Sequence, residues 1–352
     1  MPEHLDFHYQ KEYILESGAS LPGFQLAYTT HGQLNQERSN VVWVCHALTG
    51  NSDFTDWWGG LFGEGKLYDP ADWFIVCANT LGGCYGSTGP LSVNPKTLQP
   101  FYHSFPQLTN RDIVGAFDLL RQELGLEQIH TLIGGSLGGQ QALEWAVQKP
   151  QVFQRLVHVA SNARHSAWGI AFNESQRMAI RQDPSWNSDS ATAGLEGLKT
   201  ARAIAMLSYR HYSCYEASQQ EPGNSITDDF RAASYQVYQG EKLASRFNAY
   251  TYWLLSKAMD SHHVGRGRGG VAKALERLTS KCLFVGVDTD LLFPIEEQLF
   301  LHQQVPGSSF AQLRSCYGHD GFLVETEQLS KAIHEFYKTE IVTQQHYESS
   351  EV

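Results

Sequence analysis

The sequence predicts an α/β fold in which a mostly parallel, doubly wound sheet is interrupted by a helical insertion. Short apolar runs alternate with segments of helical spacing over the first half of the chain, and this alternation returns near the C-terminus. Between the two parts lies a long stretch without a buried strand. Strands that are buried on both faces appear as continuous apolar runs, and the βαβ alternation places helices on both faces of a parallel sheet.

The expected elements follow from these runs. Strands are expected over residues 41–45, 73–78, 129–133, 156–160, 282–287 and 310–314. Helices are expected over residues 111–124, 140–146 and 322–337, with Gly125 ending the first of them.

The stretch between the two sheet-forming parts contains helical patterns over residues 172–180, 195–207 and 243–259. We therefore expect a core domain formed by residues 1–161 and 275–352, and a helical lid insertion formed by residues 162–274. In open α/β folds ligands bind at the carboxyl edge of the strands, and the lid is expected to cover that edge.

The composition of the chain limits which partners it can bind and in which cellular compartment it is expected. The 352 residues carry a formal net charge of −11, which does not favour binding to nucleic acid or to an anionic membrane. No stretch approaches the roughly 20 apolar residues of a membrane span, and the N-terminus has no secretory signal pattern. The six cysteines are scattered and the histidines show no ligand spacing, so we expect a cytoplasmic protein without a metal site.

Ser136 is the most informative residue of the chain. It lies in the sequence GGSLGG (134–139), between a predicted strand and a predicted helix. A serine between glycines on a strand-to-helix turn is the layout of a nucleophile elbow, which presents the hydroxyl at the carboxyl edge of a sheet. The pattern therefore predicts that Ser136 attacks a carbonyl.

A serine nucleophile needs a base, and the base needs an orienting acid. After an elbow the expected chain order is serine, acid and histidine. Asp290 and His319 follow the two C-terminal strands in that order, on loops at the same sheet edge as Ser136. Asp288 competes for the acid role, but Asp290 lies further from its strand and directly precedes an apolar LLFP segment, so Asp290 is our prediction.

The reaction also needs donors for the oxyanion. In a nucleophile-elbow fold one amide belongs to the residue after the serine, here Leu137, and the other comes from the loop after an early strand. The sequence HALTG (46–50) follows the strand at 41–45, and Leu48 is the best candidate within it.

Several long motifs resemble those of the homoserine O-acetyltransferase family. The resemblance runs from roughly residue 10 to residue 340. It is carried by HALTG (46–50), NTLGGCYGSTGP (79–90), GGSLGGQQALEW (134–145), IAFNE (170–174), AR (201–202), SYR (208–210), RFNA (246–249), DLLFP (290–294) and GHDGF (318–322). Two positions depart from the family pattern: Leu137 stands where many members have methionine, and Asn248 replaces a frequent aspartate.

The resemblance implies an α/β-hydrolase fold with a helical lid, and a homodimer formed through lid helices. It implies transfer of an acetyl group from acetyl-CoA, as a co-substrate, to the hydroxyl of L-homoserine in methionine biosynthesis, with no permanently bound cofactor. It also implies an amino-acid site in which Arg202 pairs with the homoserine carboxylate, Tyr209 assists, and Asp320 holds the ammonium.

Other functions use the same motifs. A homoserine O-succinyltransferase or a serine O-acyltransferase would share the triad, and the sequence discriminates poorly between donors. A plain esterase would deacylate with water, but it would need no amino-acid clamp. A non-catalytic binding protein on this fold would usually lack a member of the triad, and Ser136, Asp290 and His319 are all present.

Overall fold

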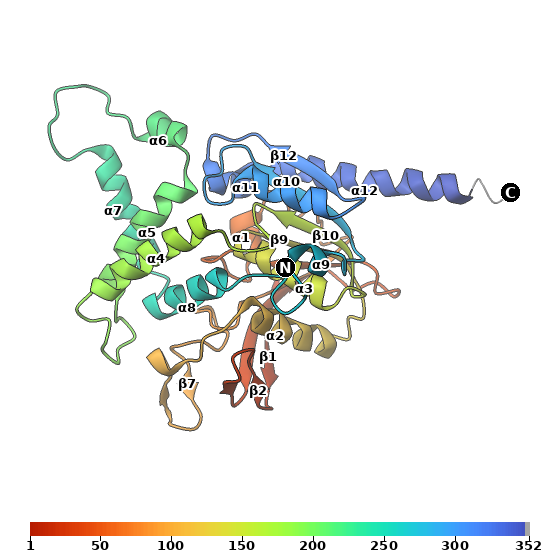
Figure 1. Ribbon diagram of the computed structural model, residues 1–352, viewed down its shortest axis with the longest axis horizontal. Coiled ribbons are helices and arrows are strands. Elements are labelled where there is room, and N and C mark those ends of the chain that lie inside the picture. The colour runs from red at the N-terminus through yellow and green to blue at the C-terminus, as the bar shows by residue number, and fades with distance from the viewer. Residues whose placement is uncertain (349–352) are drawn as a thin grey trace.

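In the computed structural model, which describes residues 1–348, the apolar runs of the sequence lie side by side in one twisted sheet (Figure 1). Within the described residues this sheet has eight strands, which are, in spatial order, β1 (Glu3–Tyr9), β4 (Phe24–His31), β6 (Phe74–Ala78), β5 (Val41–Cys45), β9 (Ile129–Gly135), β10 (Phe153–Val159), β11 (Lys281–Val287) and β12 (Ser309–Leu313). From β6 to β12 neighbouring strands pair in parallel, whereas β4 is antiparallel to both β1 and β6. The predicted mostly parallel, doubly wound sheet is confirmed.

Side chains of the central strands alternate between two hydrophobic cores. In β5, Trp43 and Cys45 belong to one core, and Val42 and Val44 belong to the other. Successive strand residues point to opposite faces of a sheet, so this division places one core on each face. Because both faces are covered, every residue of β5 is apolar and buried.

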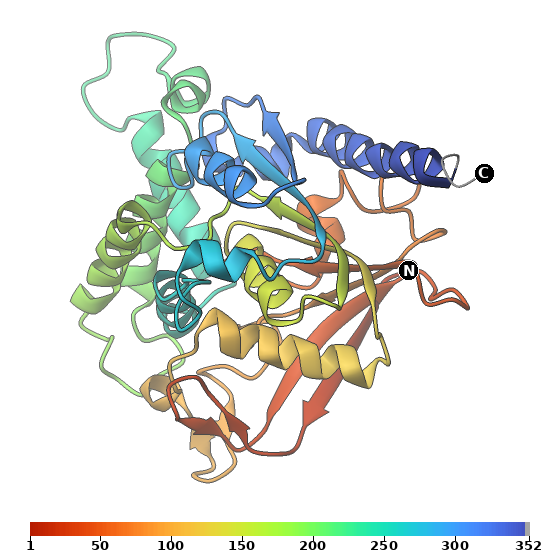
Figure 2. The same ribbon diagram turned by 45° about the vertical axis from the view of Figure 1, so that its right-hand side comes forward.

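Helices of the two sequence halves cover these two faces (Figure 2). The core that contains Trp43 includes side chains of α2 (Asn110–Glu123), α3 (Leu137–Gln148) and α10 (Ile295–Gln304). The core that contains Val42 includes side chains of α1 (Phe54–Trp58), α11 (Gly321–Val324) and α12 (Thr326–Glu348). The remaining short elements of these two halves are β2 (Tyr13–Ile14), β3 (Ser20–Leu21), β7 (Val93–Asn94), β8 (Gln99–Pro100) and the 3₁₀ turns η1 (Tyr102–Ser104) and η2 (Gly318–Asp320).

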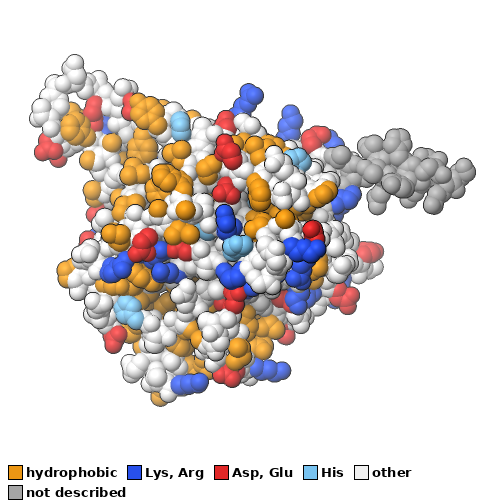
Figure 3. Space-filling view, in the orientation of Figure 1, with side chains coloured by type: hydrophobic (Ala, Val, Ile, Leu, Met, Phe, Trp, Pro, Cys, Tyr) orange, Lys and Arg blue, Asp and Glu red, His pale blue; other side chains and the backbone are white. Residues whose placement is uncertain are grey.

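Between β10 and β11 the described chain forms helices and no named strand. These helices, which we call the helical insertion, are α4 (Ala167–Gln182), α5 (Leu195–Tyr209), α6 (Tyr212–Gln219), α7 (Arg231–Ala244), α8 (Ala249–Asp260) and α9 (Val271–Leu275). Most of the insertion lies at one end of the sheet, and Figure 2 shows the N-terminus and helix α12 toward the other end. Large apolar side chains remain exposed on the insertion, among them Leu207, Tyr212 and Val237. Orange side chains are visible over this part of the molecule at the upper left of Figure 3.

Two predicted helices are interrupted in the structure. The helix expected over 243–259 is wrong, because α7 ends at Ala244 and α8 begins at Ala249. Asn248 caps α8 by accepting a hydrogen bond from the amide of Thr251 at 2.8 Å, which satisfies a free helix-terminal donor. The helix expected over 322–337 is likewise broken at Glu325, between α11 and α12.

The sequence did not predict the N-terminal strands β1 and β4. Most residues of β1 are exposed and polar, so its sequence EHLDFHY lacks the apolar pattern of a buried strand. Pairing with β4 across all seven residues of β1 fixes it at the edge of the sheet.

The structure describes residues 1–348 of the 352-residue chain. The last four residues of the predicted core segment 275–352 lie outside the described residues. Within residues 1–348, none of the helices combines the length and the apolar composition required to cross a bilayer.

Candidate active site

Ser136, Asp290 and His319 meet at the carboxyl edge of the sheet. Ser136 lies between β9 and α3, Asp290 follows β11, and His319 lies in η2 after β12. Because β9 to β12 run parallel, their carboxyl ends share one edge, and three residues distant in sequence become neighbours there. All three side chains are buried, with at most 5% of each residue exposed.

The three side chains form a continuous hydrogen-bonded relay. His319 Nε2 lies 2.9 Å from Ser136 Oγ, and His319 Nδ1 lies 2.6 Å from Asp290 Oδ2. A neutral imidazole that donates from Nδ1 to the carboxylate leaves Nε2 free to accept the serine proton. The rings of Phe293 and Phe322 pack against His319, with centroids 5.1 Å and 5.3 Å away, and help to fix its orientation.

The two candidate acids occupy different environments. Besides His319, Asp290 accepts hydrogen bonds from the amides of Leu292 and Phe293 at its Oδ1, at 2.8 Å and 2.9 Å. Asp288 instead accepts from the amide of Ser315 at 3.0 Å. The contact geometry therefore agrees with the choice of Asp290 as the partner of His319.

The backbone around Ser136 explains the glycines of the elbow. Ser136 has φ = 58° and ψ = −125°, a left-handed conformation that non-glycine residues rarely adopt. A Cβ atom on Gly138 would lie 2.1 Å from the carbonyl oxygen of Cys45, and one on Gly134 would lie 2.2 Å from that of Gly138. No side chain fits at these positions, so the strained turn requires glycine on both sides of the serine.

The loop at residues 46–50, which we call the oxyanion loop, lies beside this turn. Leu48 lines the same cavity as Ser136, and Leu137 is the first residue of α3, where helix amides have no partner within the helix. His46 fixes the base of the loop by accepting from the amide of Thr80 at 3.0 Å. Burial lowers the pKa of His46 to about 4, so the imidazole is neutral and able to accept this bond.

Arg202 and Tyr209 approach the relay from helix α5 of the insertion. The guanidinium carbon of Arg202 lies 5.1 Å from the centroid of the Tyr209 ring, and that ring lies 5.8 Å from the imidazole of His319. Burial raises the pKa of the Tyr209 phenol, which keeps it protonated and able to donate a hydrogen bond. The two residues are seven positions apart, two helical turns, and therefore share one face of α5.

Asp320 lines the same cavity, but it already has a cationic neighbour. Its Oδ2 lies 2.8 Å from Nε of Arg210, and both side chains are partly exposed. Arg210 belongs to the SYR motif (208–210), but the sequence did not indicate a role for it. In the sequence, an arginine at the end of a helix that pairs with a carboxylate cannot be distinguished from an arginine that is only exposed to solvent.

These residues surround one cavity of about 200 Å³. Its core wall includes Leu48, Ser136, Phe322 and two residues that the sequence did not indicate, Trp57 and Leu323. Its insertion wall consists of Arg202, Tyr209 and Arg246. The sequence did not indicate a role for Arg246, because its hydrogen-bond partners belong to loops far away in the chain.

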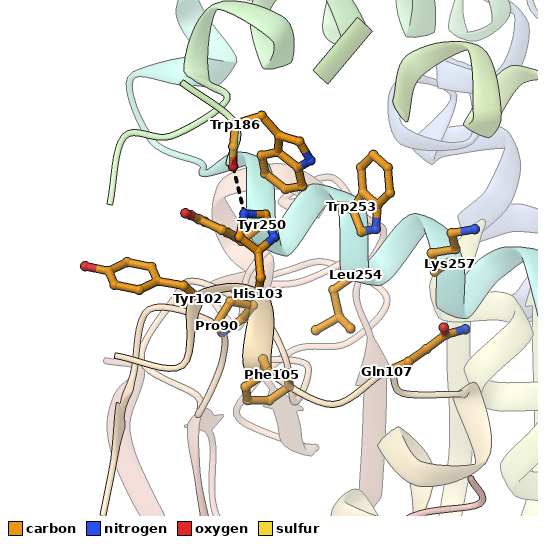
Figure 4. Close-up of a pocket in the computed structure, with 10 residues that line it drawn as sticks. All are labelled: Pro90, Tyr102, His103, Phe105, Gln107, Trp186, Tyr250, Trp253, Leu254 and Lys257. Atoms are coloured by element: carbon orange, nitrogen blue, oxygen red, sulfur yellow. Dashed lines mark hydrogen bonds between the residues drawn. The ribbon is translucent and has the colours of Figure 1, made fainter. Parts of the chain in front are cut away.

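A second cavity, of about 130 Å³, lies between α8 and the loop around η1 (Figure 4). Trp186, Tyr250 and Trp253 form its aromatic side, and His103 donates from Nε2 to the carbonyl oxygen of Trp186 at 2.7 Å. None of the predicted site residues lines this cavity.

The main cavity combines a hydroxyl, a base and opposite charges. The relay can remove the proton of Ser136, while Arg202 and Asp320 offer one cationic and one anionic group to a zwitterionic ligand. In the part of the chain that the structure describes, no group of three or more His, Cys, Asp or Glu side chains is placed to hold a metal ion.

Comparisons with known proteins agree with this fold. The model of the alpha/beta hydrolase fold family matches residues 40–326. A homoserine O-acetyltransferase of Cyclobacterium marinum is 54% identical over 94% of each chain. The crystal structure of homoserine O-acetyltransferase from Bacillus anthracis is 26% identical, covers 96% of this chain and 97% of its own, and superposes with a TM-score of 0.88.

An acetylester hydrolase from Corynebacterium glutamicum has the same fold, with a TM-score of 0.85 at 22% identity, covering 96% of each chain. That likeness concerns the fold alone. The relative at 54% identity extends over almost the whole chain, so it decides the family. With the α/β-hydrolase fold and the serine–histidine–aspartate geometry in place, this chain belongs to the homoserine O-acetyltransferase family.

Proposed function

We propose that the protein transfers an acetyl group from acetyl-CoA to the hydroxyl of L-homoserine and so forms O-acetyl-L-homoserine for methionine biosynthesis. The observation that carries the proposal is the meeting of the Ser136–His319–Asp290 relay with Arg202 and Asp320 in one cavity. A plain hydrolase needs the relay but has no use for a pair of opposite charges beside it.

The first half-reaction acylates the enzyme. His319 Nε2 takes the proton of Ser136 as Oγ attacks the thioester carbonyl, and the amides of Leu48 and Leu137 stabilise the negative oxygen. The tetrahedral intermediate collapses as the carbon–sulfur bond breaks, and CoA leaves with the proton from His319. Asp290 keeps Nδ1 protonated and stabilises the imidazolium throughout.

The second half-reaction passes the acetyl group to the acceptor. The homoserine carboxylate pairs with Arg202, Tyr209 assists, and the ammonium binds Oδ1 of Asp320, because Oδ2 lies against Arg210. His319 then removes the proton of the homoserine hydroxyl as its oxygen attacks the acetyl carbonyl. The tetrahedral intermediate collapses, the bond between the acetyl carbon and Ser136 Oγ breaks, and Oγ takes the proton from His319. Acetyl-CoA acts as a co-substrate in this scheme, and each proton moves through His319, so no resident cofactor is required.

The decisive test is an assay of the full-length protein with acetyl-CoA or succinyl-CoA as donor and with homoserine, serine or water as acceptor. We expect acetyl-CoA and homoserine to give the highest kcat/KM, parallel double-reciprocal plots, and one acetyl group on Ser136 by mass spectrometry. Intersecting plots without a trapped acyl-enzyme would contradict the double displacement. A preference for succinyl-CoA, serine or water would instead identify one of the alternative activities.

We also propose that the protein is a homodimer that associates through the insertion. Leu207 on α5, Tyr212 on α6, and Val237 and Tyr238 on α7 are each more than half exposed. Apolar side chains gathered on one part of a surface favour association. Sedimentation equilibrium of the full-length chain measures the assembly mass directly, and a monomer at micromolar concentration would refute this assembly.

A cytoplasmic location is the corresponding proposal for the compartment. All six cysteines are free, and Cys45, Cys77, Cys214 and Cys282 are buried as thiols. Unpaired cysteines in a globular core are typical of a reducing compartment. Cell fractionation with an antibody against the protein tests this location.

A further inference from the structure

Arg246 connects the insertion to the oxyanion loop. It lies between α7 and α8, and its Nη1 donates a hydrogen bond to the carbonyl oxygen of Thr49 at 2.8 Å. The same nitrogen donates to the hydroxyl of Tyr85. Thr49 directly follows Leu48, so the contact is made one residue away from the proposed oxyanion donor.

The oxyanion loop is fixed strongly at its base and more sparsely at its tip. His46 accepts from Thr80 at the base, and the amide of Gly50 donates to the carbonyl of Ala47 at 2.9 Å within the loop. The Arg246 contact is the hydrogen bond that joins the tip, at Thr49, to the insertion.

The space behind the loop is not completely filled. A small cavity of about 10 Å³ lies there, and Leu48, Tyr85 and Phe247 are among the residues that line it. A void leaves the adjacent side chains without contacts on one side. Leu48 itself is buried in the core, so the small gap is local, and the hydrogen bond from Arg246 to Thr49 adds a directional restraint on the tip of the loop.

We propose that Arg246 is a positioning residue that holds the oxyanion loop so that the amide of Leu48 points at the reacting carbonyl. The inference rests on the proposed function and deepens it. The guanidinium fits this task because one planar group donates hydrogen bonds to both Thr49 and Tyr85. Arg246 thereby connects the tip of the loop to the segment that follows β6. The contact between Arg246 of the insertion and Thr49 is then part of what completes the oxyanion site.

This role makes a specific kinetic prediction. Both half-reactions pass through a tetrahedral intermediate with a negative oxygen, so a misplaced Leu48 amide slows acylation and deacylation alike. A residue that binds only the acceptor slows deacylation alone. A residue that binds the phosphates of CoA affects acylation by acetyl-CoA, but not acylation by a small neutral ester.

The experiment compares Arg246→Met and Tyr85→Phe with wild type in three single-turnover reactions. These are acylation by acetyl-CoA, acylation by p-nitrophenyl acetate, and transfer of the acetyl group to homoserine. We expect Arg246→Met to slow all three by about 10²-fold, the loss typical of one oxyanion donor, with the KM for homoserine nearly unchanged. Tyr85→Phe keeps the Thr49 contact and is expected to slow all three by a smaller, equal factor.

Arg277→Met is the matched control, because Arg277 is an exposed arginine outside the insertion. It is expected to leave all three rates unchanged. Normal acylation of Arg246→Met by p-nitrophenyl acetate, with a raised KM for acetyl-CoA, would overturn the proposal and assign Arg246 to the donor.

If Arg246→Met does not fold, the three single-turnover rates of Tyr85→Phe serve as the test. Three unchanged rates in that variant would overturn the proposal. A wild-type enzyme that reacts with the ester but not with acetyl-CoA would refute the proposed function, while the ester rates of the variants would still test Arg246.

Discussion

The core wall of the cavity and its insertion wall hold their functional groups in different ways. On the core wall, Ser136 and His319 are almost fully buried and are fixed by a strained turn and short hydrogen bonds. On the insertion wall, Arg202 and Tyr209 are partly exposed and are held by a contact between a cation and a ring. Under the proposed function the sheet edge performs the bond chemistry, and Arg202 and Tyr209 of the insertion bind the acceptor.

The largest expected effect tests the core wall. Asp290→Asn should lower kcat by about 10⁴-fold, because an amide cannot keep His319 in the required tautomer. Asp288→Asn is the matched control, since an asparagine oxygen can still accept from the amide of Ser315, and we expect little change in kcat. Steady-state kinetics of the two variants measure the contrast. A larger loss in Asp288→Asn would transfer the orienting role to Asp288.

The next effect tests the insertion wall. Arg202→Ala should weaken the use of homoserine by about 2–5 kcal/mol, because the ligand carboxylate is left unpaired in the cavity. Acylation of Ser136 should survive, since Arg202 does not touch the relay. A single-turnover measurement of CoA release without acceptor separates the two steps.

Loss of this CoA burst in Arg202→Ala would show that Arg202 supports the fold or the donor, and the division between the walls would fail at this residue. Arg202→Lys keeps the charge but not the planar fork, and should fall between wild type and Arg202→Ala.

The smallest expected effect is on the pH dependence of the free energy of unfolding, through buried histidines of the core domain. Burial lowers the pKa of His46 to about 4 and that of His158 to about 3. The unfolded chain takes up protons on these histidines near pH 6.5, whereas the folded chain does not, so the free energy of unfolding decreases as the pH falls below 6.5. At pH 5 each histidine should cost about 2 kcal/mol of stability.

Urea unfolding at pH 7 and pH 5 measures this loss. His158→Leu removes one of these titrations, together with two ring nitrogens that have no hydrogen-bond partner among residues 1–348, and should reduce the difference between the two pH values. An equal difference in wild type and His158→Leu would mean that other groups control acid unfolding.

The two walls also differ in how much the sequence indicated. The relay was predictable because its signals are local: a serine between glycines, and an aspartate and a histidine directly after apolar strands. The central strands were predictable for the same reason, since burial on both faces makes every residue apolar. The edge strand β1 was not, because pairing with β4 rather than an apolar pattern holds it in place.

The missed residues depend on contacts that no local pattern contains. Arg246 acquires its partners from two loops that lie 161 and 197 positions away in the chain. The break before α8 was missed because Asn248 sits in an otherwise helical pattern, and its capping role appears only when its side chain bonds Thr251.

The crowding around the elbow has a consequence for redesign of this enzyme. With the carbonyl of Cys45 so close to Gly138, a library that varies the residues flanking Ser136 would consist largely of misfolded proteins. New acceptors are better sought by randomising positions 202 and 209, where partly exposed side chains face the cavity from a single helix. Proteins of this fold that use another acceptor should show the same asymmetry, with the elbow kept and positions 202 and 209 changed.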